Sequence, residues 1–402
     1  MIDEFIQSLA TTRLTERAHG PMTSMGVKWH KLPVWDDLDL VMADDRLPES
    51  ADVGSNLVIG ENRGRPLELE IPLLISDMSF GSLSMQAKVT LARGAELAGT
   101  AICSGEGGIL AEEIRESSRY MYELGTGEFG YRALGDRQPL WPGAQSFHFK
   151  GGQAAKTGTG GHLPAEKATD RIADTRGVEP GKAVISPPTF RDLRTVADFR
   201  RRVDEVQEAM GDVPIGFKLS ANRLEEDIEF ALQVGADYII LDGRGGSTGA
   251  APILFRDHIS IPTIPALIRA RQILDAKVPG GGVKLIITGG LRVPTDFVKA
   301  MALGADGVAL ANSALQAVGC IGTRRCQSNL CPAGIATQDP VYAMNFQGTP
   351  EQLSNYLGNS VAVMQRLARA CGHSHLDEFT RDDLQVRNPE MAHLTGLPLG
   401  TR

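Results

Sequence analysis

The chain has 402 residues, of which 42% are hydrophobic, and its formal net charge is −8. An acidic chain of this kind is a poor binder of nucleic acid, which needs a basic face. No run of 18 apolar residues predicts a membrane span, and the charged N-terminus lacks the apolar core of a signal peptide, so we expect a cytoplasmic protein.

The chain begins with residues 1–55, which predict a short helix and then a polar, proline-containing arm over a barrel. From residue 56 onward, short apolar segments alternate with helical patterns. Strands are predicted at 71–76, 100–104, 146–150, 214–220, 237–242, 262–265, 283–288 and 307–311. Helices are predicted at 84–98, 191–210, 224–234, 265–274 and 294–303. This alternation predicts an α/β fold, a parallel (β/α)₈ TIM barrel over residues 56–319.

Two joints between a helix and a strand repeat the tripeptide Gly-Ala-Asp, at 235–237 and 304–306. Gly235 and Gly304 fit the left-handed position at a helix C-terminus, so these joints are interpreted as construction of the fold. After the barrel, the sequence predicts a cysteine segment at 320–340 and a helical extension at 341–402. Within that extension, one amphipathic helix is expected to end at Gly372.

Three of the five cysteines, Cys320, Cys326 and Cys331, lie within twelve residues. Thiolates are soft ligands for iron–sulfur clusters or zinc, but these spacings differ from the C-x₂-C of structural zinc sites. Three cysteines followed by Pro332 match a three-iron cluster, which lacks the fourth corner. The alternative, three cysteines buried as small apolar side chains, fits poorly with the surrounding arginine, glutamine and asparagine. The isolated Cys103 and Cys371 are predicted to be ordinary core cysteines.

The ends of the last predicted strands are rich in glycine. Gly289 and Gly290 end one strand, and Asn312 follows the next. Barrels commonly bind a phosphate with these loops, although an ordinary tight turn is the alternative. The loop with Gly245 and Gly246 has small residues that let backbone lie against a flat ring or an anion. No G-x-G-x-x-G follows a first strand, so no nicotinamide-binding Rossmann unit is predicted.

Charged side chains stand at other strand ends. Lys218 ends a strand, where it can neutralise a flavin or a phosphate, or else be a surface charge. The segment 150–164 combines Lys150, Lys156 and His162 with five glycines, a composition that suits a bound anion. Glu106 lies on a glycine loop, where it can move protons or be an ordinary solvated carboxylate.

These motifs together resemble the FMN domain of glutamate synthase in its archaeal-type and stand-alone forms. The resemblance extends from about residue 70 to 340 and rests on segments 78–84, 104–108, 152–161, 185–188, 249–252 and 319–338. It implies FMN in the barrel mouth, 2-oxoglutarate stacked over it, and a [3Fe-4S] cluster on Cys320, Cys326 and Cys331.

The resemblance also implies a role for each matching residue. The loop that touches both flavin and 2-oxo acid matches Met78 and Ser79, and the lysines of that site match Lys150 and Lys156. Arg176 corresponds to an arginine for a substrate carboxylate, and Glu106 to a glutamate that handles protons on ammonia. Flavin contacts match Lys218, Gly245, Gly246, Gly289 and Gly290.

The implied reaction is that of a glutamate synthase, an oxidoreductase acting on CH–NH₂ donors. Electrons arrive through the cluster, and reduced FMN transfers hydride to the imine of 2-oxoglutarate and ammonia, giving L-glutamate. Two positions depart from the pattern: His162 stands where large glutamate synthases have glutamine, and Ile2 where their amidotransferase domain has a nucleophilic cysteine. We therefore expect ammonia from a glutaminase-type partner or from solution, and electrons from a partner subunit or ferredoxin, within an oligomer.

Several alternatives remain open. One is a subunit like N-methylglutamate synthase, which acts on glutamate and methylamine and whose barrel subunit lacks the cysteine run; another is a related amine or 2-oxo acid oxidoreductase. An isomerase or aldolase can use the same barrel, because fold does not fix function. A non-enzymatic electron-transfer or regulatory subunit is the last, and the intact Lys150, Lys156, Arg176 and Glu106 argue against it.

Overall fold

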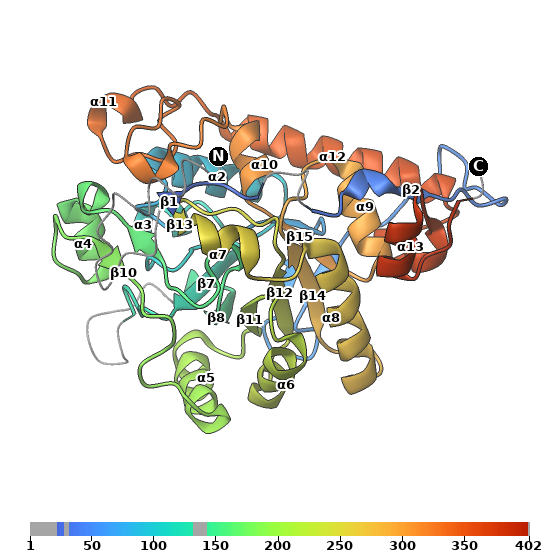
Figure 1. The fold of residues 1–402 in the computed structure, drawn as a ribbon, viewed down its shortest axis with the longest axis horizontal. Helices are drawn as coiled ribbons and strands as arrows, with labels where there is room; N and C mark the ends of the chain where they lie inside the picture. The colour runs from blue at the N-terminus through green and yellow to red at the C-terminus, as the bar shows by residue number, and fades with distance from the viewer. Residues whose placement is uncertain (1–21, 28–31, 132–142, 401–402) are drawn as a thin grey trace.

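A closed parallel barrel forms the centre of the protein, in a computed structural model that describes residues 22–27, 32–131 and 143–400 (Figure 1). Around the barrel the strands run β5–β6–β7–β8–β11–β12–β14–β15, and β15 pairs with β5. Their bounds are β5 Leu73–Ile75, β6 Ile102–Cys103, β7 Tyr120–Gly125, β8 Ser146–Lys150, β11 Ile215–Ser220, β12 Tyr238–Asp242, β14 Lys284–Thr288 and β15 Gly307–Leu310. The predicted (β/α)₈ TIM barrel is therefore confirmed.

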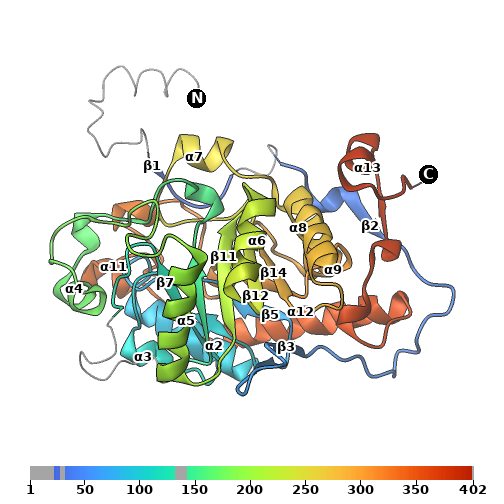
Figure 2. The same ribbon diagram turned by 90° about the horizontal axis from the view of Figure 1, so that it is seen from below.

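Helices cover the outside of the barrel (Figure 2). They include α2 Met85–Leu97, α5 Val196–Met210, α6 Leu224–Val234, α8 Thr263–Lys277, α9 Pro294–Ala302 and α10 Asn312–Ala317. The sequence explains their ends: Thr195 and Asp198 form a capping box at the start of α5, and Gly235 ends α6 with φ of +102°. Gly304 likewise has φ of +105°, so both Gly-Ala-Asp joints have the expected backbone.

One predicted strand was wrong, one strand was missed, and one helix begins later than predicted. Residues 262–265 are not a strand, because Thr263 begins helix α8. The strand missing from the prediction is β7, in which Glu123 points into the barrel and interrupts the apolar pattern on which the prediction relied. Helix α5 begins at Val196 rather than 191, where Thr195 caps it. The short helix expected at the N-terminus lies outside the described residues.

Four small antiparallel sheets lie outside the barrel strands. They pair β1 Met22–Thr23 with β13 Ala251–Pro252, β2 Leu38–Leu40 with β16 Leu384–Val386, β3 Leu57–Ile59 with β4 Leu67–Leu69, and β9 His162–Leu163 with β10 Val184–Ile185. The β3–β4 hairpin packs on inward-facing side chains such as Leu74 and Tyr238 and so closes the bottom. The β1–β13 pair lies at the opposite end, where strand β1 approaches the cysteine segment.

The long helix α12, Pro350–Ala370, packs along α2, α9 and α10 on one side of the barrel (Figure 1). Gly94 of α2 permits this, because a Cβ there would lie 2.7 Å from the Leu353 Cβ. The remaining helices are α3 Ala111–Ile114, α4 Asp170–Arg176, α7 Ile253–His258, α11 Pro340–Ala343 and α13 Pro389–Thr395. Among the helices described, none combines the length and apolar character needed to cross a membrane.

Candidate active site

Charged side chains from three strands meet at the carboxyl end of the barrel. Lys150 ends β8 and Lys218 lies opposite it on β11, while Asp77 follows β5. The Lys218 ammonium donates to Asp77, and the Lys150 Nζ lies 3.5 Å from Asp77 Oδ2. Burial opposes ionisation of Asp77, but Lys218 and Lys150 outweigh burial and hold its pKa well below the usual range. The base of the mouth is thus a network of buried, charged groups.

Glu106 stands above this network, on the loop after β6. Its Oε2 lies 3.2 Å from the Lys150 Nζ. Burial opposes ionisation, but Lys150, Lys156 and Arg176 together lower the pKa of Glu106 to about 2. A Cβ at position 161 would lie 1.8 Å from Glu106 Oε1, so glycine is required for the loop 150–164 to pack here.

Lys156 ends the short 3₁₀ helix η4 Ala154–Lys156, and its side chain is buried. The amide N–H of Ala154 donates to Asp242 Oδ2 over 2.9 Å, which anchors this turn to the end of β12. Burial lowers the pKa of Lys156 to about 8, although Glu106 acts in the opposite direction. Lys156 therefore changes charge close to neutral pH.

Arg176 is the last residue of α4, and its guanidinium contacts the loop that follows β5. Its Nη2 donates to the Phe80 carbonyl over 2.7 Å and to Ser79 Oγ over 3.1 Å. Its buried Nε has no hydrogen-bond partner among the described residues. Burial lowers the pKa of Arg176 to about 10, with Glu106 opposing, so the guanidinium stays charged near neutral pH.

A cavity at the barrel mouth brings most of the predicted site residues together. Its lining includes Met78, Ser79, Glu106, Lys150, Lys156, Asn312, Cys320 and Cys326, with Asp77, Gln153 and Thr248. His162 and Arg176 are not among the described residues that line it. His162 lies on β9 with its Nε2 3.2 Å from Thr159 Oγ1, and Arg176 contacts the lining residue Ser79.

The cavity continues along the mouth toward the last strands. A second cavity, lined by Lys218, Gly245, Gly246, Gly289, Gly290 and Asn312, shares Asp77 and Asn312 with the first. A third, of about 220 Å³, shares Gly245, Gly289, Gly290 and Arg292 with the second and adds Trp35 and Arg244. The glycines permit this shape: a Cβ on Gly246 would lie 2.1 Å from Asp242 Oδ1.

The cysteine segment follows α10 and borders the first cavity. Strand β1 continues into residues that hold the segment: Arg324 Nη1 donates to the Gly26 carbonyl over 2.9 Å, and the Gln327 N–H donates to Ser24 Oγ over 3.1 Å. Burial raises the pKa of Cys326, as do the thiolate forms of Cys320 and Cys331. The three sulfur atoms thus interact electrostatically, and they come from one loop.

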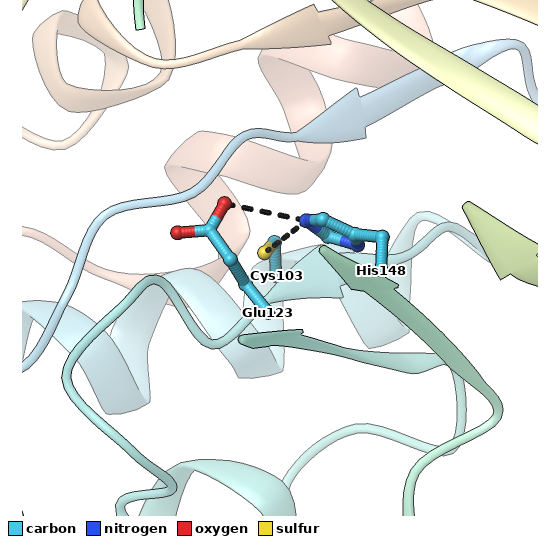
Figure 3. A group of neighbouring side chains, drawn as sticks. All are labelled: Cys103, Glu123 and His148. Atoms are coloured by element: carbon cyan, nitrogen blue, oxygen red, sulfur yellow. Dashed lines mark hydrogen bonds and ion pairs between the residues drawn. The ribbon is translucent and has the colours of Figure 1, made fainter. Parts of the chain in front are cut away.

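Several residues at the mouth were missed by the sequence prediction. Asp77 and Asp242 follow or end barrel strands, and their position was the signal that could have found them. Deeper in the barrel, Glu123 and His148 are fully buried beside Cys103 (Figure 3). Cys103 is buried as expected, but it has polar neighbours rather than a purely apolar setting.

Comparisons with known proteins agree on one family. Residues 34–374 match the model described as the conserved region in glutamate synthase. An archaeal-type glutamate synthase [NADPH] of Thermotoga neapolitana is 36% identical over 302 residues, covering 73% of this chain and 58% of that protein. A glutamate synthase large subunit-like protein of Rhizobium meliloti is 32% identical, covering 92% of this chain and 88% of that one. The match thus spans little more than half of the length of the Thermotoga neapolitana protein.

Solved structures with the same fold include a chimera of (S)-mandelate dehydrogenase and a flavocytochrome b2 with pyruvate bound. The first has a TM-score of 0.58 and 17% identity and covers 90% of this chain and 93% of that one. The second has a TM-score of 0.57 and 16% identity and covers 100% of this chain and 89% of that one. At these identities the likeness is one of fold.

Proposed function

Because the chain belongs to the glutamate synthase family, we propose that it is an FMN- and iron–sulfur-dependent oxidoreductase that converts 2-oxoglutarate and ammonia to L-glutamate. The observation that carries the proposal is one cavity lined both by Lys150, Lys156 and Glu106 and by Cys320 and Cys326. This cavity therefore has both cations that can bind a dicarboxylate and thiols that can hold an electron-transfer centre.

The glycine-lined part of the mouth suits FMN. Gly289 and Gly290 have φ of +126° and +92°, and with Gly245 they expose backbone to the cavity. The buried Asn312 Oδ1 and Arg244 Nε have no hydrogen-bond partner among the described residues, so each can bind a polar group of the cofactor. Arg244 and Arg292 are suited to its phosphate. When bound, FMN supplies the hydride that reduces the substrate imine.

The protein's own groups handle the dicarboxylate and the protons. Lys156 lines the cavity together with Met78 and Ser79 and is suited to one carboxylate of 2-oxoglutarate. Arg176, which contacts the lining residue Ser79 and has a buried Nε without a hydrogen-bond partner among the described residues, is proposed for the other carboxylate. Ammonia adds to the carbonyl carbon and water leaves, which requires proton transfers at nitrogen and oxygen. Glu106, a carboxylate at neutral pH, is placed to accept a proton from nitrogen. Holding both reactants in one geometry supplies much of the rate.

The three cysteines suit a multi-iron cluster better than a single ion. A single ion needs ligand atoms within a few ångströms of one another; among the described residues, the group whose ligand atoms all lie within 4.8 Å is Cys103, Glu123 and His148. At least two of the thiols of Cys320, Cys326 and Cys331 therefore lie more than 4.8 Å apart, which favours one iron per thiol over a single shared ion. We propose that electrons enter the protein through this cluster, from a partner subunit or from ferredoxin. We also expect the chain to act in an oligomer that has a source of ammonia.

The test starts with anaerobic purification, a visible spectrum, and counts of iron and FMN. The photoreduced protein is then mixed with 2-oxoglutarate, ammonia, or both. The proposal expects about three irons and one FMN per chain, with flavin reoxidation only when both substrates are present. Reoxidation by another oxo acid or amine, methylamine included, would support the cofactors of the proposal but contradict its substrate. Absence of both cofactors would end the proposal.

A further inference from the structure

Glu123 lies inside the barrel, beneath the floor of the cavity, and its side chain is fully buried. Its two oxygens have different partners: Oε1 lies 3.4 Å from the Lys150 Nζ, and Oε2 lies 3.3 Å from His148 Nε2. His148 is the register neighbour of Glu123 on β8, two residues before Lys150. Figure 3 shows the Glu123 carboxylate and the Cys103 sulfur turned toward the same edge of the His148 ring.

Hydrogen bonds fix the protons on His148. The Tyr238 hydroxyl donates to Ser146 Oγ over 3.3 Å, so its oxygen accepts from His148 Nδ1, 3.0 Å away. A carboxylate only accepts, so the contact between Nε2 and Glu123 needs a proton on Nε2 as well. We therefore assign His148 as an imidazolium with both nitrogens protonated.

With this assignment, the carboxylates around the Lys150 Nζ face at least as many cations, and Lys156 and Arg176 add positive charge beside Glu106. Three carboxylates surround the Lys150 Nζ: Glu106 at 3.2 Å, Glu123 at 3.4 Å and Asp77 at 3.5 Å. Lys150, Lys218 and the imidazolium supply three positive charges against these three negative ones. Buried charges persist when they are paired in this way.

The group Cys103, Glu123 and His148 has the composition of a metal site, but its surroundings favour the ion pairs. Burial raises the pKa of the Cys103 thiol well above its usual value, and Glu123 and Asp77 raise it further. A protonated thiol is a poor metal ligand. The Glu123 carboxylate already pairs with Lys150 through one oxygen and with His148 through the other.

We propose that Glu123, held by His148, is a positioning residue that fixes the Lys150 ammonium at the cavity floor and thereby sets the reduction potential of the bound flavin. The inference rests on the proposed function, because it assumes FMN in the glycine-lined cavity, which shares Asp77, a contact of Lys150, with the cavity that Lys150 lines. Without the negative charge of Glu123, the field of Lys150 at the cavity becomes more positive. A more positive field favours the reduced, electron-rich flavin, so its potential rises.

The first readout is the flavin midpoint potential of holoenzyme variants. E123Q keeps the shape and removes the charge, and we expect the ratio of reduced to oxidised flavin at fixed potential to rise at least tenfold, about 30 mV for two electrons. H148Q should move the potential in the opposite direction, because Glu123 then keeps its charge without the imidazolium. E123D keeps a carboxylate at this position, so its flavin potential should lie close to that of the wild type. C103S is the matched control from the same buried group and should leave the potential unchanged.

The second readout does not need flavin. In protein labelled with ¹⁵N-histidine, both nitrogens of His148 should be protonated, and the signal should be absent in H148Q. If the purified protein lacks FMN, the proposed function fails while this readout still tests His148 and Glu123. An unshifted potential in folded E123Q, or a neutral His148, would overturn the proposal. So would one equivalent of divalent metal, found by mass spectrometry in the wild type and lost in C103S.

Discussion

The Nζ of Lys88 lies 2.6 Å from Oε1 of Glu113, and both side chains are buried between α2 and α3. The same ammonium donates to the carbonyls of Met78 over 2.5 Å and Ser104 over 3.0 Å. One buried cation therefore joins the two loops that carry Met78 and Glu106, and the site geometry depends on a helix outside the barrel.

Replacing Lys88 by methionine should destabilise the fold by about 3–5 kcal/mol, because it leaves a buried carboxyl and two carbonyls without their partner. Urea unfolding measures the change. The control is R93M on the same helix. It removes the solvent-screened ion pair between Arg93 and Glu116, so the free energy of unfolding should stay close to that of the wild type. Equal losses in the two variants would contradict this role for Lys88.

Arg176 should determine affinity for the dicarboxylate. R176K keeps the charge but loses the guanidinium whose Nη2 donates to both Ser79 and Phe80. We therefore expect 2-oxoglutarate to bind at least about tenfold more weakly, a loss of about 1.4 kcal/mol in binding free energy. Calorimetric titration measures it. R171M, on the same short helix but exposed and paired with Glu112, should bind as the wild type does.

Affinity for 2-oxoglutarate should fall as the pH rises above about 8. Burial lowers the pKa of Lys156 to about 8, so the free protein loses this cation above that pH. A bound carboxylate stabilises the protonated form, and binding then takes up a proton, which weakens affinity by up to about tenfold per pH unit. In K156M the slope should disappear, whereas K182M, at an exposed lysine, should retain it. A pH-independent dissociation constant in the wild type would rule out this role.

Removal of one cysteine from the predicted cluster should remove the iron and keep the flavin. In C326S we expect iron to fall to background while FMN stays at one per chain, because the glycine-lined cavity lies beyond the cysteine segment. Iron analysis and the visible spectrum measure both. C371S changes a cysteine outside the cysteine segment, at the C-terminal end of α12, and should keep its iron.

The FMN site should not tolerate a side chain at position 246. A Cβ there would lie 2.1 Å from Asp242 Oδ1, so G246A must displace the loop and should release FMN and destabilise the fold by about 1–3 kcal/mol. G358A is the matched control: Gly358 is exposed within α12 with no atom within 4 Å of its Cβ position, and alanine should stabilise by about 0.5–1 kcal/mol. Retained FMN in G246A would contradict the assignment.

The sequence was sufficient for the barrel because most strands are apolar and are followed by helical periodicity. It failed at β7, where the inward Glu123 is a polar residue whose partners, Lys150 and His148, come from another strand. The same limit applies to the site. Motifs carry Lys150, Lys156 and Glu106 and so made them candidates, whereas Asp77 and His148 take part through pairings between distant segments. Such pairings follow from strand register, which a single sequence does not specify.

The contact between Ser24 and Gln327 joins residues 303 positions apart. During synthesis, strand β1 leaves the ribosome long before the cysteine segment it holds. At synthesis rates of roughly 5–20 residues per second, this delay is on the order of 15–60 seconds. The order of synthesis therefore makes assembly of the proposed cluster a late step, and we expect a chain truncated before Cys331 to lack iron even with a complete barrel.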